Sequence, residues 1–176
     1  KATESDTVLI FISGHGIQDE KGNYYFPTNE VDLKNIPATA LSWQDFHAAL
    51  PEVRARRVLV LADTCQSGGI MGSNQANTAQ LADKINKQGH RLVFVACRGE
   101  ESSLERDEWG HGAFTKAILE AFAGSADANN DKLISFRELN DYVTARVTAL
   151  TDNRQHPQLP FLDQFEPDAV LGKTGL

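Results

Sequence analysis

Residues 58–69 read VLVLADTCQSGG, and residues 7–16 read TVLIFISGHG. Each segment is a continuous run of apolar residues followed by a reactive side chain, Cys65 in the first and His15 in the second. Apolar runs without alternation are typical of strands buried on both faces of a parallel sheet. Because open α/β sheets build their sites at the carboxyl ends of strands, the sequence predicts that Cys65 and His15 meet in one crevice.

The rest of the chain alternates between strand and helix patterns. Residues 92–96 predict a third buried strand, and residues 169–171 predict a last edge strand. Apolar residues at helical spacing predict helices over 43–50, 114–122 and 136–150. Helices between parallel strands make an α/β three-layer sandwich with a mostly parallel central sheet. With no repeat or linker in the sequence, we expect a single domain over residues 1–176.

Composition excludes several classes of partner. The chain has 17 Lys and Arg against 24 Asp and Glu, a net charge of −7, which argues against nucleic acid. Its two cysteines form neither a disulfide framework nor a metal-binding spacing, which favours a reducing compartment. No apolar stretch reaches the roughly 18 residues of a membrane span, and the first residues show no signal-peptide pattern. We therefore expect a cytoplasmic protein with no membrane partner.

Cys65 and His15 together suit nucleophilic catalysis. A free thiol with a pKa of about 8.5 is only slightly ionised at neutral pH, so a cysteine nucleophile needs a neighbouring base. An imidazole can accept the thiol proton and later donate one to the leaving amine. Glycines follow both residues, and the amides of Gly16 and Cys65 are the candidate oxyanion hole. Taken singly, each residue also fits a structural role, Cys65 in the core and His15 in a loop.

The order of the motifs resembles that of the caspase-like cysteine peptidases, most closely the bacterial metacaspase-like (orthocaspase) branch. The motifs are SGHG at 13–16, YYFP at 24–27, DTCQSGG at 63–69, VACR at 95–98 and GAFT at 112–115. The resemblance implies a caspase-like fold, a His15 and Cys65 dyad, and no required cofactor. Family members begin with a strand, a helix and a second strand that this sequence does not contain. The predicted domain is therefore amino-terminally incomplete, and the missing segment or other domains of a longer protein are expected partners.

Cys97 is the competing nucleophile, because residues 96–99 nearly reproduce the caspase signature and also end a strand. In caspases the histidine lies about fifty residues upstream of the nucleophile. Cys65 lies 50 residues after His15, whereas Cys97 lies 82 residues after it. Spacing therefore favours Cys65 and leaves Cys97 to shape the substrate cleft. Residues 109–112, which precede a helix, either rim that cleft or form a plain loop.

Asp63 points to the substrate preference. It lies two residues before Cys65, so strand alternation directs both side chains to one face. A carboxylate there favours a cation, and a guanidinium can pair with it bidentately, which favours Arg over Lys. The resemblance also implies cleavage after basic residues, with Ser13 and Asp63 in the pocket. Glu100 and Glu101 are further possible contributors, and the alternative is that Asp63 only caps the loop after its strand.

Residues 127–138 match most of a calcium-binding loop. The candidate ligands are Asp127, Asn129, Asp131 and Glu138. Lys132 occupies the position where such loops have glycine, which predicts weak binding or none. The same residues also suit a capping box between Ser135 and Glu138, with side-chain turns before it. Calcium is thus a possible ligand and is not required.

The sequence as a whole predicts a cysteine endopeptidase that acts on protein or peptide substrates. One alternative is a catalytically idle caspase-like module that binds partners and is gated by calcium. Another is a thiol hydrolase that uses the same dyad on a non-peptide acyl group.

Overall fold

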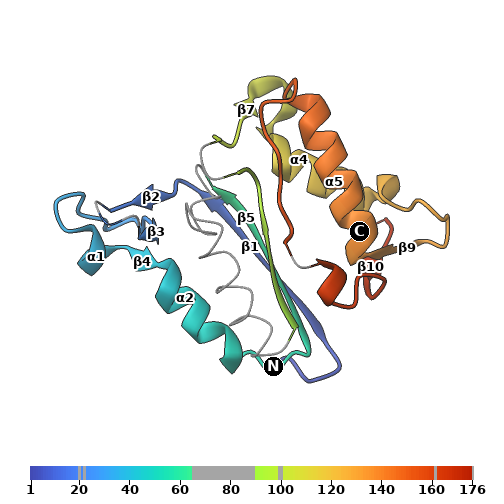
Figure 1. Ribbon diagram of the computed structural model, residues 1–176, viewed down its shortest axis with the longest axis horizontal. Coiled ribbons are helices and arrows are strands. Elements are labelled where there is room, and N and C mark those ends of the chain that lie inside the picture. The colour runs from blue at the N-terminus through green and yellow to red at the C-terminus, as the bar shows by residue number, and fades with distance from the viewer. Residues whose placement is uncertain (20, 22, 65–89, 99–100, 161, 176) are drawn as a thin grey trace.

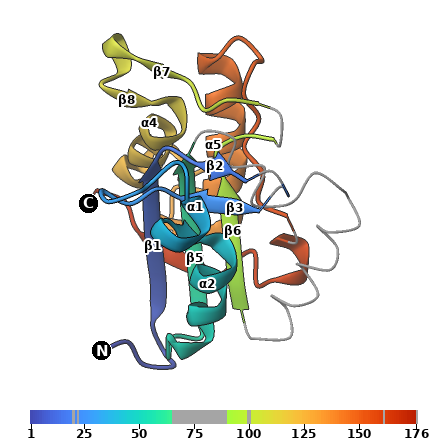
Figure 2. The ribbon, with the colours of Figure 1, turned by 90° about the vertical axis from the view of Figure 1, so that its left-hand side faces the viewer.

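The computed structural model describes residues 1–19, 21, 23–64, 90–98, 101–160 and 162–175. Its main sheet has three parallel strands in the order β1-β5-β6 (Figures 1 and 2). These strands are β1 (Thr7–Gly14), β5 (Arg57–Thr64) and β6 (His90–Val95). Helices lie on both sides of this sheet, so the predicted α/β sandwich with a parallel sheet is confirmed (Figure 1).

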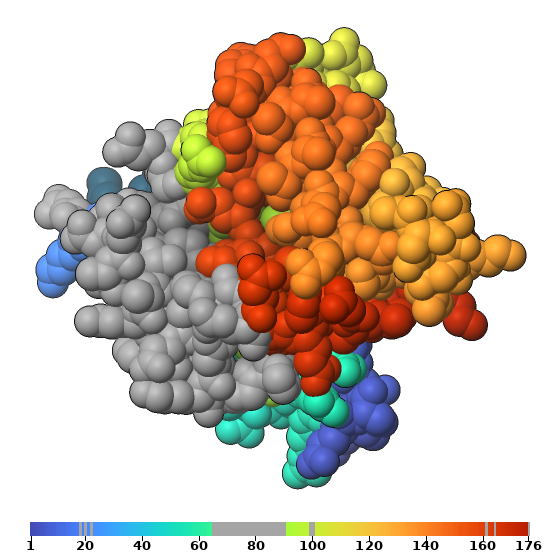
Figure 3. Space-filling view, turned by 45° about the vertical axis from the view of Figure 1, so that its right-hand side comes forward, coloured from blue at the N-terminus to red at the C-terminus, as the bar shows by residue number. Residues whose placement is uncertain are grey.

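Alternate residues of β5 pack against different layers. Leu59 and Leu61 belong to the core shared with α4 (Ala113–Glu120) and α5 (Phe136–Leu150). Val58, Val60 and Ala62 belong to the core shared with Trp43 of α2 (Trp43–Ala49). Figure 3 shows α5 on the outer face of its layer, with the carboxyl-terminal segment beneath it. Within the described residues, no helix is long and apolar enough to cross a membrane.

β1 differs from the sequence-based expectation. Its predicted burial on both faces is wrong, because Leu9 is 41% and Phe11 is 43% exposed. Among the described strands β1 pairs only with β5, which explains the exposure. In contrast, Val58–Thr64 of β5 are all buried, as the sequence predicts for a central strand.

A small antiparallel sheet flanks the α2 side of the main sheet. It consists of β2 (Ile17–Gln18), β3 (Tyr24–Phe26) and β4 (Leu41–Ser42), in the order β2-β3-β4. Tyr24–Phe26 of the YYFP motif is therefore the middle strand of this sheet. The short helix α1 (Ile36–Thr39) precedes β4, and η1 (Leu50–Glu52) follows α2.

The second half of the chain builds the other helical layer. α4 continues into a π-helical turn, η4 (Ala121–Ser125), where Gly124 has a φ of 117°. The strand β9 (Leu133–Ser135) pairs with β10 (Val170–Lys173), so the predicted strand near 169–171 joins a separate two-stranded sheet. A 3-10 turn, η5 (Leu162–Gln164), lies between them in sequence.

A second hairpin precedes α4. It is formed by β7 (Glu105–Arg106), the turn η3 (Asp107–Trp109) and β8 (His111–Gly112).

Candidate active site

The carboxyl ends of β1 and β5 lie side by side. The parallel register pairs Ser13 with Asp63 and Gly14 with Thr64. His15 is the next residue after β1 and is exposed. Cys65, Gly68 and Gly69 lie outside the described residues, so the predicted dyad and the Cys65 amide of the oxyanion hole stay predictions.

Gly14 ends β1 in a conformation that favours glycine. Its φ is 148°, which L side chains rarely adopt. A Cβ atom there would meet nothing within 4 Å, so the backbone angle and not crowding selects glycine. His15 and then Gly16, the candidate oxyanion donor, follow Gly14 directly.

Thr64 is held from the small sheet. Its hydroxyl lies 2.6 Å from the hydroxyl of Tyr24 in β3, and both side chains are almost completely buried. The bond crosses from β5 to the α2 side of the sheet. Tyr24 thereby holds the end of β5 from the α2 side of the sheet. The Asp63 side chain points to the opposite side.

Asp63 is buried, with 6% exposure, and its carboxylate has three hydrogen-bond donors. The Ser103 hydroxyl donates to Oδ1 at 2.6 Å. The Thr115 amide donates to Oδ2 at 3.1 Å, and the Thr115 hydroxyl donates to the same oxygen. Thr115 is the third residue of α4, so Asp63 satisfies one of the free amides at the start of that helix and complements its dipole.

The β7–β8 hairpin contacts this carboxylate directly. A Cβ atom at Gly112 would lie 3.0 Å from Oδ2 of Asp63, tighter than nine in ten real Cβ contacts. Gly112 pairs with Glu105 across the hairpin. The close approach of β8 to the end of β5 therefore favours glycine and brings Glu105 into this region.

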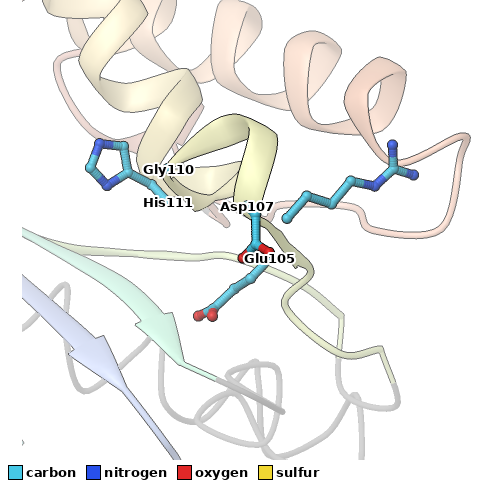
Figure 4. A pocket seen from close by; sticks show the side chains of 5 residues that line it. Glu105, Asp107, Gly110 and His111 are labelled. Carbon is cyan, nitrogen blue, oxygen red and sulfur yellow. The ribbon is translucent and has the colours of Figure 1, made fainter.

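A hollow opens at the hairpin. Its lining residues are Glu105, Arg106, Asp107, Gly110 and His111. Figure 4 shows the Glu105 and Asp107 side chains on the same side of η3, with Glu105 extending toward the strand ends. Residues 109–112 thus contribute Gly110 and His111 to a surface hollow, and all four charged or titratable side chains around it are exposed.

Arg106 is the only cation among these lining residues, and other groups engage it. Its guanidinium lies 4.7 Å from the ring centre of Trp109. It also lies 3.2 Å from Glu108 and 3.5 Å from Asp152. The Arg106 guanidinium therefore interacts with groups that do not line the hollow.

Cys97 is completely buried, and its thiol donates a hydrogen bond to the carbonyl oxygen of Glu101 at 3.1 Å. The Glu101 side chain accepts from the amide of His156 at 2.8 Å and lies 2.7 Å from its Nδ1. Burial alone would raise the pKa of Glu101, but hydrogen bonds from His156 and the Arg98 amide hold it below its ordinary value. These contacts secure the segment that leads to Ser103. Glu100 lies outside the described residues.

Gln155 is a supporting residue that sequence reasoning missed. It is completely buried. Its Nε2 donates to the carbonyl oxygen of Ala96 at 2.9 Å, and its Oε1 accepts from the amide of Leu104 at 2.8 Å. Gln155 thus ties the end of β6 to the start of the hairpin. A single Gln in a segment rich in proline carries no pattern that predicts burial.

The predicted calcium ligands hydrogen-bond to the protein itself. Asp127 accepts from the amides of Asp131 and Lys132 at 3.1 and 2.9 Å. Glu138 forms the predicted capping box with Ser135 at the start of α5. No group of three or more His, Cys, Asp or Glu residues is arranged to hold a metal in the described part of the chain. The calcium site stays a prediction, whereas the capping box is confirmed.

The α/β sandwich is that of a caspase-like protein. The family model for the caspase domain, a peptidase family, matches residues 1–166, and the chain belongs to this family. No curated protein sequence matches the chain. A similar fold occurs in the crystal structure of protein GSU0716 from Geobacter sulfurreducens, with a TM-score of 0.52 and 18% sequence identity. The match covers 90% of this chain and 66% of that one. Because the sequence identity is only 18%, the match supports the fold alone.

Proposed function

We propose that the protein is a cysteine endopeptidase in which Cys65 is the nucleophile and His15 is the general base and acid. The observation that carries this proposal is the register of β1 and β5, which pairs Gly14 with Thr64. Consecutive Cα atoms are about 3.8 Å apart, so residues that directly follow a paired position begin close together. Membership of the caspase domain family supports the peptidase class.

The chemistry follows from the two side chains. His15 accepts the thiol proton, and the thiolate of Cys65 forms a bond to the substrate carbonyl carbon. The amides of Gly16 and Cys65 stabilise the resulting oxyanion. His15 then gives its proton to the departing amine as the C–N bond breaks, leaving a thioester. Water, deprotonated by His15, attacks the thioester and restores the Cys65 thiol.

The proposed substrates are protein or peptide chains cleaved after a basic residue, with Arg preferred over Lys. Asp63 supplies negative charge beneath the pocket, and Ser13, its register partner in β1, lies beside it. Cys97 supports the wall of the cleft through Glu101. The Asp63 carboxylate also caps the start of α4, a role that the sequence alone did not predict.

The test combines turnover with labelling of the nucleophile. The wild-type protein is expected to cleave peptides that end in Arg before the bond and to react rapidly with iodoacetamide at neutral pH. Cys65→Ala should abolish both, and His15→Ala should abolish turnover and slow labelling at least tenfold. Cys97→Ser is the matched control and should retain activity, because its side chain is buried and can still donate to Glu101.

Three results would overturn the proposal. Cleavage that survives in folded Cys65→Ala but disappears in folded Cys97→Ser would assign the nucleophile to Cys97. A wild-type protein that neither cleaves any peptide nor reacts faster than a free thiol would indicate a binding module. Turnover of thioesters or simple esters without any peptide cleavage would indicate a non-peptide hydrolase.

A further inference from the structure

The hydrogen bonds at Asp63 limit what its carboxylate can offer a substrate. An ionised carboxylate has about four lone-pair positions, two on each oxygen. Oδ2 already accepts two bonds from Thr115, and Oδ1 accepts one from Ser103. A bidentate guanidinium needs a free position on each oxygen. Asp63 can therefore contribute negative charge, but it cannot accept an arginine side chain bidentately without releasing the start of α4.

A second carboxylate lies next to this one through the hairpin. Glu105 pairs with Gly112, at which a Cβ atom would lie 3.0 Å from Oδ2 of Asp63. Ser103, two residues before Glu105, is itself a hydrogen-bond donor to Asp63. Two independent connections thus hold β7 beside the buried carboxylate. Figure 4 shows the Glu105 side chain extending from β7 toward the ends of the strands.

The charge around Glu105 is not neutralised. Glu105 and Asp107 are both exposed and line the hollow. Within the described ranges no ion pair joins either carboxylate to a cation, and Arg106 pairs with Glu108 and Asp152. The hollow therefore combines carboxylates that form no ion pair with the described residues, open access and proximity to the strand ends.

We infer that Glu105 is a specificity-determining residue, whose carboxylate pairs with the guanidinium of the substrate residue before the cleaved bond. The inference rests on the proposed peptidase function and deepens it. Asp63 is then a positioning residue: it holds α4 and β8, and through them the hairpin that presents Glu105. Asp107 adds negative charge to the same hollow without taking part in the pair.

The test compares matched peptides ending in Arg, Lys or citrulline, which has the shape of Arg without its charge. Glu105→Gln keeps the length of the side chain and removes its charge. It is expected to lower kcat/KM for the Arg peptide about tenfold, mainly through KM, and to leave the citrulline peptide within twofold of wild type. Glu108→Gln, in the same hairpin but paired with Arg106, is the control and should change neither value.

Different results would refute the role of Glu105 and the proposed peptidase function. Wild-type cleavage after Arg with an unchanged Arg-to-citrulline ratio in Glu105→Gln would refute the role of Glu105 and leave the peptidase intact. Equal losses for both peptides would indicate a merely structural role and also refute it. Absence of peptide cleavage and of rapid Cys65 labelling in the wild type would overturn the proposed function itself. As a positive check, Glu105→Arg should raise kcat/KM for a peptide ending in Asp relative to the Arg peptide.

Discussion

Asp63 caps the helix that begins at Ala113, because its Oδ2, at the end of β5, accepts the amide of Thr115. The residue at the N-cap position of α4 is Gly112, which has no side chain to do this. A strand residue has therefore taken over the capping bond, and the same side chain lies beneath the proposed substrate pocket.

Replacement of Asp63 should affect stability and turnover together. Asp63→Ala leaves the Thr115 amide and the Ser103 hydroxyl without their acceptor, and we expect a loss of about 1–3 kcal/mol in the free energy of unfolding. Asp63→Asn keeps an acceptor oxygen and should lose less. Urea denaturation measures the stability, and both variants should turn over the Arg peptide more slowly while Cys65 labelling of the folded protein stays near wild type. Equal stability of Asp63→Ala and wild type would contradict the capping role.

Gly112→Ala should destabilise the protein by about 1 kcal/mol, because the Asp63 carboxylate must shift by a few tenths of an ångström to admit the new methyl group. The double variant with Asp63→Ala is the control, since removal of the carboxylate also removes the clash. The cost of Gly112→Ala should therefore shrink in that background, and a double-mutant cycle in urea gives the coupling free energy. Strictly additive losses would show that the contact is unimportant.

Ser135→Ala should lower the free energy of unfolding by about 1 kcal/mol. Ser135 Oγ accepts from the Glu138 amide, and Glu138 Oε2 accepts from the Ser135 amide, so the substitution breaks one half of the capping box. Ser102→Ala, at an exposed position outside any helix, is the matched control. Thermal or urea unfolding measures the difference, which should be absent in the control.

Glu120 should make the stability depend on acidic pH. Hydrogen bonds from Arg146, together with Lys116 and Tyr142, lower the pKa of Glu120 from 4.5 to about 2 despite partial burial. Because the folded-state pKa is depressed, the stabilisation is complete above the unfolded pKa and is lost as pH falls from about 4.5 toward 2. With a quarter of the side chain exposed, we expect a contribution of about 1–2 kcal/mol.

Glu120→Gln tests this dependence. Urea titrations at pH 6 and pH 3 should show that the variant loses less stability on acidification than wild type, by about 1 kcal/mol, because pH 3 is still above the folded-state pKa. Glu52→Gln, an exposed residue of η1, serves as the control and should behave like wild type. A Glu120→Gln variant with the wild-type pH dependence would rule out this ion pair as its source.

The sequence predicted those helices and strands in which the local pattern of apolar and capping residues matches the packing of the folded protein. α5 spans the predicted 136–150, with Leu139, Val143 and Val147 buried, because its apolar period and capping box point to the same helix. The helix after Ser42 is also present, and the Asp45 amide donates to the Ser42 hydroxyl. β5 is buried throughout, as its unbroken apolar run indicates.

Other features depend on neighbours that a local pattern does not reveal. β1 has the same kind of apolar run as β5, yet Leu9 and Phe11 are exposed because apolar residues alone do not specify whether a second strand lies alongside. Strand alternation predicts only that Asp63 shares a face with Cys65, and it gave no indication of Thr115, which is 52 residues away. Likewise, no local pattern links His156 to Glu101, and only the fold brings the two side chains together.

The contact between Gly112 and Asp63 also constrains how the substrate preference of this fold can diverge. Asp63 and Gly112 each serve folding as well as the site, so exchange of either carries a stability cost that selection must overcome first. Glu105 faces open space and caps nothing, so it can vary at little cost to the fold. New substrate preferences in relatives of this chain should therefore arise by substitutions in the β7–β8 hairpin, while the residues at the end of β5 stay the same.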